Sequence, residues 1–550
     1  MDMMGLNRKR GDGTWRTWMQ WMQWRGRMKH MKCMKHMKRR KAAVGTWLVE
    51  GVLWIALSLL ILLLACPSWA ATYYVTQAGA GAADGSTYAN AMSVAGHNAG
   101  SFSGDDVIYL CGNITSTVAP PSAGTSGHPI VYDGACPGYP GVIDGENNIA
   151  FGFGDGTTTG KIYLTVKNLE IKNLYSESGS AAGIWLRSAN SVTTAALHSV
   201  VDNCKVHDVS SLGTGAVAGI DSRGDGLTVS NSQIYNIWYD GIYSDGPNFT
   251  AYNNYIHDVD QTTGTPGGDC IELGTPVGAF VHHNRLDHSS RASKHCIIIS
   301  NSAEVEGTKA IIEHNEMTQP IASVGDTTSR CASPEDNTNG TIFRFNKLTG
   351  GYNAVTPLGS IDFYGNIVIS PVNSYINHQG SSVVGSVLNV YNNTFVGETS
   401  YGVYFTANRT YTVNIKNNII YDGNKGIRQS APGGDNTIAI NYNDIYSTTT
   451  AYTNVTGGAN DITSDPLLAS NYRLLRGSPA INAGVNVCTA EGVPFATCTG
   501  DGTGTWTDIK GSVVPHNGKI SIGAYQFTSF DTEQGESAAR KSWRRVFRKF

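Results

Sequence analysis

Two carboxylates flank a Cys-Ile pair in the segment GGDCIELGTP, which spans residues 267–276. Asp269 and Glu272 are of the residue type that binds a hard cation or takes part in acid–base catalysis. Carboxylates about 5 Å apart repel one another by roughly 3 kcal/mol at an effective dielectric constant near 20, and a cation or a shared proton relieves that repulsion. Whether this pair forms a site depends on which other residues the fold brings to it.

Repeats run through the middle of the chain. Eleven segments contain an alternating apolar strand, then one or two Asn, an apolar residue and a polar turn: LTVKNLEIKNL (164–174), SVVDNCKVHDV (199–209), LTVSNSQIYNI (227–237), FTAYNNYIHDV (249–259), AFVHHNRLDHS (279–289), AIIEHNEMTQP (310–320), TIFRFNKLTGG (341–351), IDFYGNIVISP (361–371), LNVYNNTFVGE (388–398), VNIKNNIIYDG (413–423) and IAINYNDIYST (438–448). Seven shorter segments place a small residue before a branched one: AGIWL (182–186), AGIDS (218–222), DGIYS (240–244), DCIEL (269–273), HCIII (295–299), YGVYF (401–405) and KGIRQ (425–429). Each repeat therefore carries at least two short strands and shows no helical period.

One such repeat cannot bury its apolar face alone, whereas stacked repeats form a continuous core. About two dozen residues per coil, several short strands and an Asn at the bend predict an all-β fold, a parallel β-helix of about eleven or more coils. Asn tolerates left-handed backbone, and stacked amides can bond along the ladder. We therefore expect the Asn residues to hold the coils together rather than to bind ligands.

Stacking turns the repeats into columns of side chains, because equivalent positions of successive coils lie about 4.8 Å apart. One column contains Ala182, Ala218, Asp240, Asp269 and His295, and a second contains Trp185, Asp221, Tyr243, Glu272 and Ile298. We predict that Asp240, Asp269 and Glu272 converge as ligands of a metal ion. Ca²⁺ fits these oxygen ligands, whereas the lack of clustered Cys and His disfavours zinc. Asp221, Tyr243 and His295 border the same face as candidate substrate-binding residues; the alternative is that the carboxylates only cap turns.

The first 70 residues predict a leader. A basic run rich in Met, Trp and His precedes the apolar stretch VLWIALSLLILLLA (52–65) and the segment PSWAA, where a signal peptidase would cleave after Ala70. The basic run alone would also suit nucleic acid or a membrane. A membrane anchor is a rival, although Glu50 and Pro67 leave little apolar length, and LLAC ending at Cys66 resembles a lipoprotein cleavage box. We expect a secreted or cell-envelope protein.

Charge and cysteines are consistent with export. Beyond residue 70 the chain has 27 basic and 40 acidic residues, a net charge near −13, which disfavours binding to nucleic acid. Eight cysteines remain there, and Cys111 with Cys136 and Cys488 with Cys498 are the locally spaced candidate disulfides. We interpret the cysteines as structural and expect a monomer.

The repeats resemble those of right-handed parallel β-helix proteins of the pectin-lyase-like superfamily, over about residues 72–465. Residues 71–96, followed by GDDVIYLCG, look like the opening cap and first coil of secreted members. DPLLASNYRLLRGSPAINAG (465–484) and SIGAYQF (521–527) resemble the C-terminal region of choice-of-anchor Q proteins. We divide the chain into a leader (1–70), an N-terminal cap with first coils (71–160), the β-helix core (161–465), a closing region (466–530) and a basic tail (531–550), which could contact an anionic membrane or envelope surface.

The resemblance implies a polysaccharide as partner and, as an option, the chemistry of polysaccharide lyases. In these enzymes calcium and a Lys or Arg base remove the proton next to a uronate carboxylate before the glycosidic oxygen leaves. On this sequence Lys294 or Arg291 would be the catalytic base, or equally a clamp for the substrate carboxylate, since acidic neighbours favour a charged Lys. The sequence lacks GHG and NTD motifs and the DH plus RxPxxR pair of classical pectinases. The rival is a non-catalytic surface protein that binds glycans or other cells.

Overall fold

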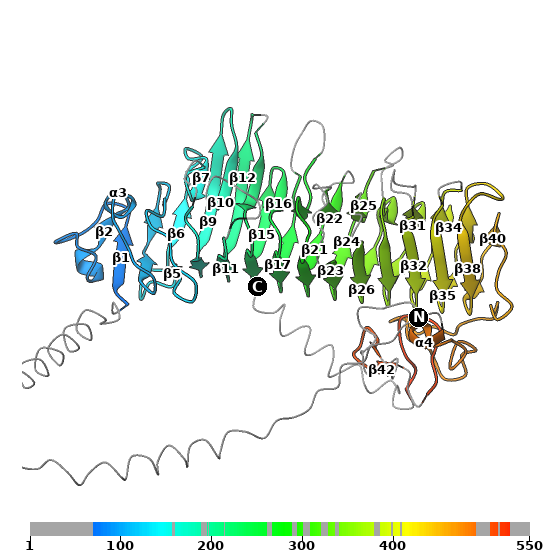
Figure 1. The fold of residues 1–550 in the computed structure, drawn as a ribbon. Helices are drawn as coiled ribbons and strands as arrows, with labels where there is room; N and C mark the ends of the chain where they lie inside the picture. Colours follow the sequence, from blue (N-terminus) through cyan, green and yellow to red (C-terminus); the bar gives the residue numbers. More distant parts are fainter. Residues whose placement is uncertain are drawn as a thin grey trace, which may run out of the picture. The chain divides into compact units, whose positions relative to one another are not determined.

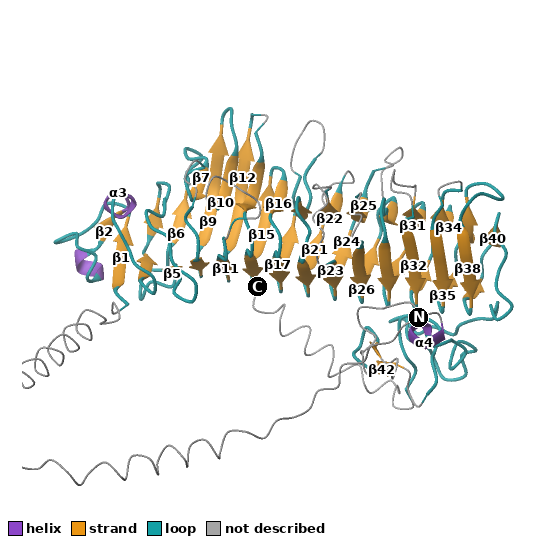
Figure 2. Cartoon of the chain, in the orientation of Figure 1, coloured by secondary structure: helices purple, strands orange, loops and turns teal. Residues whose placement is uncertain are grey.

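The chain folds as a right-handed parallel β-helix, which confirms the predicted fold class (Figure 1). Each coil passes through three sheets, and each strand pairs in parallel with its equivalent one coil later. Strands and loops make up almost all of the described chain (Figure 2). The computed structural model describes residues 70–156, 160–188, 195, 197–213, 215–260, 267–288, 294–300, 309–320, 328–335, 340–378, 385–397, 400–407, 410–490, 506–514 and 518–528.

The three sheets are named A, B and C in the order in which a coil visits them. Sheet A is ordered β2 (Met92–Ser93), β1 (Thr72–Thr76), β3 (Val107–Leu110), β5 (Ile130–Asp133), β8 (Leu164–Lys167), β11 (Val200–Asp202), β14 (Thr228–Ser230), β17 (Thr250–Tyr252), β20 (Phe280–His282), β23 (Ala310–Glu313), β26 (Thr341–Arg344), β29 (Ile361–Tyr364), β32 (Val387–Tyr391), β35 (Thr412–Lys416) and β38 (Thr437–Asn441). Sheet B is ordered β4 (Asn113–Ile114), β6 (Val142–Asp144), β9 (Glu170–Ser176), β12 (Lys205–Ser211), β15 (Gln233–Ile237), β18 (Tyr255–His257), β21 (Arg285–Asp287), β24 (Glu316–Thr318), β27 (Lys347–Thr349), β30 (Ile367–Ile369), β33 (Thr394–Val396), β36 (Ile419–Tyr421) and β39 (Asp444–Tyr446). Sheet C is ordered β7 (Phe151–Phe153), β10 (Ala181–Arg187), β13 (Val217–Arg223), β16 (Asp240–Asp245), β19 (Ile271–Leu273), β22 (His295–Ile299), β25 (Arg330–Pro334), β28 (Asn353–Val355), β31 (Ser374–His378), β34 (Tyr401–Phe405), β37 (Lys425–Gln429) and β40 (Thr450–Thr453).

An asparagine ladder runs through the bend between sheets A and B. Its members are Asn254, Asn284, Asn315, Asn346, Asn366, Asn393, Asn418 and Asn443. Each of these amides bonds to the next coil, and Asp461 accepts from Asn443 at the end of the ladder. The sequence pattern gives one Asn two roles, which the structure assigns to different residues. The ladder Asn makes the amide bonds, whereas the residue before it, such as Asn417 with φ of 58°, takes the left-handed backbone.

The core is a continuous column of aliphatic and aromatic side chains between the sheets. Ile234, Ile256 and Leu286 occupy successive coils of sheet B, and each is fully buried. They are the apolar residues that follow the Asn in the repeats 227–237, 249–259 and 279–289. Burial of such side chains, about 25 cal/mol per Å² of apolar surface removed from water, stabilises the stack coil by coil.

The N-terminal end is closed by a short cap. The helix η1 (Tyr88–Asn90) and the helix α3 (Val94–Asn98) lie beside β1 and β2, and Ser93 caps α3 by accepting from the backbone N–H of Gly96. Cys111 and Cys136 form the predicted disulfide.

The other cysteines differ in state. Cys488 is also disulfide-bonded, and its predicted partner Cys498 lies outside the described residues. The free cysteines within the described residues are buried: Cys204, Cys270, Cys296 and Cys331.

The closing region packs on the outer faces of sheets A and B. It contains α4 (Val487–Ala490) and the antiparallel pair β41 (Trp506–Thr507) and β42 (Val513–Val514). Val487, Val514 and Ile520 pack with side chains from β26, β29 and β32. The amide of Asn392 donates to the Ser521 carbonyl at 3.2 Å, which ties the region to the coils.

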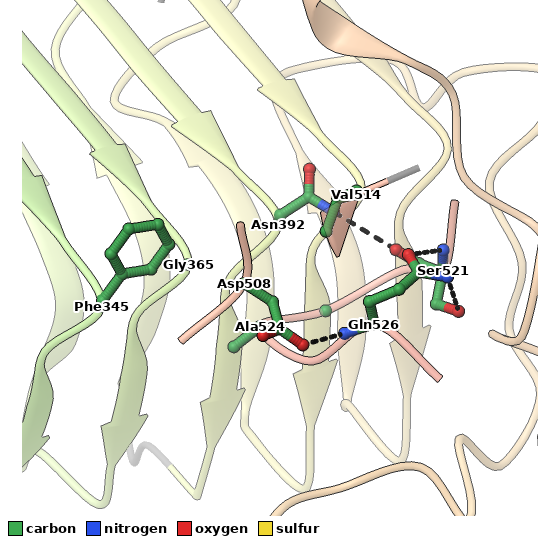
Figure 3. Close-up of a pocket in the computed structure, with 9 residues that line it drawn as sticks. Phe345, Gly365, Asn392, Asp508, Val514, Ser521, Ala524 and Gln526 are labelled. Atoms are coloured by element: carbon green, nitrogen blue, oxygen red, sulfur yellow. Dashed lines mark hydrogen bonds between the residues drawn. The ribbon is translucent and has the colours of Figure 1, made fainter. Parts of the chain in front are cut away.

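A small pocket lies at this junction (Figure 3). Asp508, Ser521 and Gln526 line it, and the Gln526 backbone N–H donates to Asp508 at 2.8 Å. Burial raises the pKa of Asp508. Because these polar groups already bond within the closing region, we assign no ligand to the pocket.

The chain separates into the units Met1–Trp69 and Ala70–Phe550. The predicted leader lies outside the described residues, as does the basic tail 531–550. In the part of the chain that the structure describes, no helix is long and apolar enough to cross a membrane.

Candidate metal centre

A local irregularity in sheet C puts Asp269 and Glu272 on one face of the sheet. Cys270 and Ile271 are consecutive in sequence, yet both are fully buried within the core. Strict alternation along a strand would send one of the two outward, so the backbone bends between them and the flanking carboxylates both point outward. The neighbouring coil repeats this arrangement, because a Cβ on Gly241 would contact the core side chain of Ile256.

Strand register then brings in a third carboxylate. Ile242 of β16 pairs with Ile271 of β19, which places Asp240 beside Asp269. Ligand oxygens of Asp240, Asp269 and Glu272 all lie within 4.8 Å of one another. The structure therefore brings together the three residues that the sequence suggests as metal ligands.

Hydrogen bonds fix one oxygen of each carboxylate. Asp240 Oδ1 accepts from the Asp269 backbone N–H at 2.9 Å. Asp269 Oδ1 accepts from the His295 backbone N–H and lies 2.8 Å from His295 Nδ1. Glu272 Oε1 accepts from the Ser300 hydroxyl at 3.1 Å. The second oxygen of each carboxylate is then the atom that a cation would take.

The cluster carries unfavourable electrostatics in the absence of a cation. Burial, followed by the charges of Asp269 and Glu272, raises the pKa of Asp240 well above its ordinary value. Burial and the charge of Asp269 also raise the pKa of Glu272. Burial and the same three carboxylates raise the pKa of the nearby Tyr239 phenol to about 12. Both a shared proton and a hard cation would relieve this repulsion, and an all-oxygen donor set fits Ca²⁺.

His295 lies behind the cluster rather than open to a substrate. The ring is buried, and its Nε2 lies 3.1 Å from a guanidinium nitrogen of Arg330. A guanidinium only donates, so Nε2 accepts and the proton sits on Nδ1, which donates to Asp269. Arg330 thus sets the tautomer of His295, and His295 orients Asp269.

The two predicted bases differ in what the structure shows. Lys294 precedes β22, is half-buried, and its charge counteracts the rise in the pKa of Glu272. Its carbonyl accepts from the backbone N–H of Arg330 at 3.1 Å and from the side chain of Gln319 at 2.6 Å, which ties it to the next coil. Arg291 lies outside the described residues.

Asp221 and Tyr243 lie in the same column as Glu272, two coils and one coil before it, respectively. Asp221 is buried and accepts from Arg187 at 2.7 Å. Its pKa is raised to about 6 because the effect of burial exceeds that of the charge on Arg187. Tyr243 is half-buried with its pKa raised, chiefly by burial. Asp221 is thus already engaged by a cation, whereas Tyr243 borders the cluster.

Sequence reasoning missed Arg330, whose guanidinium lies 3.1 Å from the His295 ring. Arg330 is the first residue of the strand RCASP (330–334), which pairs with HCIII (295–299) so that Arg330 lies beside His295. The signal was the cysteine column: Cys270, Cys296 and Cys331 occupy equivalent positions of successive coils. Aligning the repeats on those cysteines would have placed Arg330 directly after Asp269 and His295.

No family model matches the sequence. No curated protein matches it either. Among solved structures, a complex of XylC with xylose aligns with 10% identity and a TM-score of 0.45 over 83% of this chain and 98% of its own. A GH136 lacto-N-biosidase from Eubacterium ramulus aligns with 13% identity and a TM-score of 0.41, over 68% and 67%. The pectate lyase Pel9A aligns with 16% identity and a TM-score of 0.37, over 84% and 98%. Similarity at this level carries no information on activity.

Proposed function

We propose that this protein is an exported, Ca²⁺-dependent enzyme of the polysaccharide-lyase type that binds an acidic polysaccharide and cleaves it by β-elimination. The observation that carries the proposal is the convergence of Asp240, Asp269 and Glu272 on the outer face of sheet C. A disulfide between Cys111 and Cys136 supports export, since such bonds persist in oxidising compartments. We also propose that the closing region is of the choice-of-anchor Q type, which its sequence resembles.

The three carboxylates would hold the cation through their outward oxygens. When bound, Ca²⁺ supplies positive charge that can bridge the protein and a uronate carboxylate. Lys294 and Arg330 flank the cluster on the following coils and supply further positive charge. These cations suit binding of the substrate carboxylate, and they favour the negative charge that develops on it when the adjacent C–H bond breaks.

Elimination needs one proton acceptor and no water. The base takes the proton from the carbon next to the carboxylate, the electron pair forms a C=C bond, and the glycosidic C–O bond breaks. The leaving oxygen takes a proton from solvent, and the base later releases its own proton to solvent. Of the described residues, Lys294 is the candidate base, because its amine borders the cluster. A bound cation that offsets the charge of the nearby carboxylates is part of this assignment.

A second function rests on a different observation. Asp240 and Asp269 are almost fully buried, at 4% and 1% exposure. A cation held so deeply could serve only to stabilise two coils. The protein would then be a non-catalytic glycan-binding or adhesion protein.

An absorbance assay separates the two. Pectate, alginate and chondroitin sulfate are incubated with the protein in Ca²⁺ or in EDTA, and the ultraviolet absorbance of new C=C bonds is followed. We expect product with one polymer in Ca²⁺ only, with kcat falling about 100-fold or more in Lys294→Ala, as for loss of a general base. Lys347→Ala is the matched control, since Lys347 pairs with Glu316 on sheet B. Binding of a polymer with no ultraviolet signal in any condition would refute the lyase and favour the second function.

A further inference from the structure

The two outward columns that contain the carboxylates continue along sheet C with different chemistry. From Asp269 the first column runs through His295, Arg330, Asn353, Ser374, Tyr401 and Lys425. From Glu272 the second runs through Ile298, Ser333, Thr356, Asn377, Tyr404 and Arg428. The face that is acidic at β19 is therefore aromatic at β34 and basic at β37.

Four of these side chains form a compact group, here called the Tyr401 cluster: Tyr401, Tyr404, Lys425 and Arg428. The guanidinium carbon of Arg428 lies 4.2 Å from the ring centroid of Tyr401 and 5.6 Å from that of Tyr404. The Lys425 amine lies 5.0 Å from the Tyr401 centroid, and the two rings lie 5.4 Å apart. All four residues are half-buried, so each retains accessible surface.

Among the described residues, Arg428 forms no ion pair with an acidic side chain. Among the described residues its guanidinium makes contact with the two tyrosine rings and no ion pair, and its buried Nε has no hydrogen-bond partner. Beyond residue 70 the chain has a net charge near −13, and the Arg428 guanidinium places positive charge on this face of sheet C. Stacking on the rings preorganises the guanidinium, whose free edge suits bidentate binding of a carboxylate.

We propose that the Tyr401 cluster is a second binding site for a carboxylate-bearing sugar. Arg428 and Lys425 would bind the carboxylate, while the tyrosine rings would contact the apolar face of the sugar ring. This inference rests on the proposed function for its view that acidic polysaccharide is the ligand.

The distance between the two sites predicts a dependence on chain length. Six strand steps separate β19 from β37, which is about 29 Å at roughly 4.8 Å per step. A short oligosaccharide can occupy one site at a time, whereas a long one reaches both. Simultaneous binding raises the effective concentration at the second site and tightens binding by at least about tenfold.

Calorimetric titration tests this with trimers and dodecamers of galacturonate, mannuronate and guluronate. Titrations in EDTA report the Tyr401 cluster without the calcium site, and titrations in Ca²⁺ report both. In Ca²⁺ we expect the dodecamer of one series to bind at least tenfold more tightly than its trimer. In Arg428→Ala the ratio of the two dissociation constants falls toward one, and binding in EDTA is lost. Arg428→Lys retains part of it, and Lys347→Ala retains all.

The outcomes separate the two proposals. If Arg428→Ala loses binding in EDTA and the wild type makes no unsaturated product, the second site is supported, and only the lyase proposal is refuted. Equal binding by wild type and Arg428→Ala, equal binding of a neutral galactan dodecamer, or no binding by any uronate would each overturn the site. If Arg428→Ala fails to fold, as judged by circular dichroism, Arg428→Gln and Lys425→Ala provide the same comparison.

Discussion

Replacing Asn366 by Ala should destabilise the β-helix by on the order of 4 kcal/mol. The side-chain amide of Asn366 donates to the carbonyls of Phe343 and Tyr364 and to Asn393. Its Oδ1 accepts from the backbone N–H and the side chain of Asn346. Five hydrogen bonds are lost, and the Asn346 N–H and the Phe343 carbonyl lose a partner in a site closed to water.

The magnitude follows from those partners. A buried polar group left unpaired costs about 1–3 kcal/mol, and each remaining lost bond costs about 1 kcal/mol or less because other partners persist. The matched control is Asn414→Ala on sheet A, where a single hydrogen bond to Asn389 is lost at a half-buried position. We expect that variant to lose about 1 kcal/mol or less.

Urea unfolding followed by circular dichroism measures the difference, and hydrogen exchange locates it. A stacked repeat loses stability where the change is made, so exchange should quicken first in the coils that contain β26, β29 and β32. A loss below about 1 kcal/mol for Asn366→Ala, or a loss equal to that of Asn414→Ala, would refute the view that the ladder holds the coils together.

Three further predictions concern the core and the acidic face of sheet C. Because the pKa of Asp240 is raised in the folded state, the folded protein binds more protons than the unfolded chain. The urea midpoint measured without Ca²⁺ should therefore fall as pH rises from about 4 toward neutrality, and Asp240→Asn should make this dependence on pH less steep. Arg187→Met should destabilise by about 3 kcal/mol or more at pH 7, because it leaves the buried Asp221 carboxylate without its cation; a loss as small as that of Arg285→Met, whose ion pair is half-exposed, would contradict this. Gly241→Ala should lower the melting temperature by several degrees, since its Cβ would lie 2.6 Å from both the Cys270 carbonyl and the Ile256 side chain. The control is Gly112→Ala, whose Cβ meets no atom within 4 Å, so that its loss of stability comes only from the strain of an Ala at positive φ.

The fold was predictable because the same pattern of residues recurs in every repeat. The apolar alternation, the Asn and the small residue recur at equivalent places, so eleven weak signals reinforce one another. The convergence of Asp240, Asp269 and Glu272 followed from the same alignment, since register carries one coil onto the next.

Other features depend on three-dimensional packing. A bend between Cys270 and Ile271 is not visible as a period of two, so the shared outward direction of Asp269 and Glu272 could not be derived from alternation. The burial of His295 and its bond to Arg330 depend on packing by the following coil. Asp221 illustrates the same point, because Arg187, which neutralises it, lies 34 positions away in sequence.

A crystal structure of the protein grown with Ca²⁺ would show whether the three carboxylates bind a cation. We expect one cation coordinated by the outward oxygens of Asp240, Asp269 and Glu272, at about 2.3–2.6 Å, and its loss in Glu272→Gln. Wild-type crystals that show no cation there at millimolar Ca²⁺, with Asp240 and Asp269 sharing a proton instead, would contradict it.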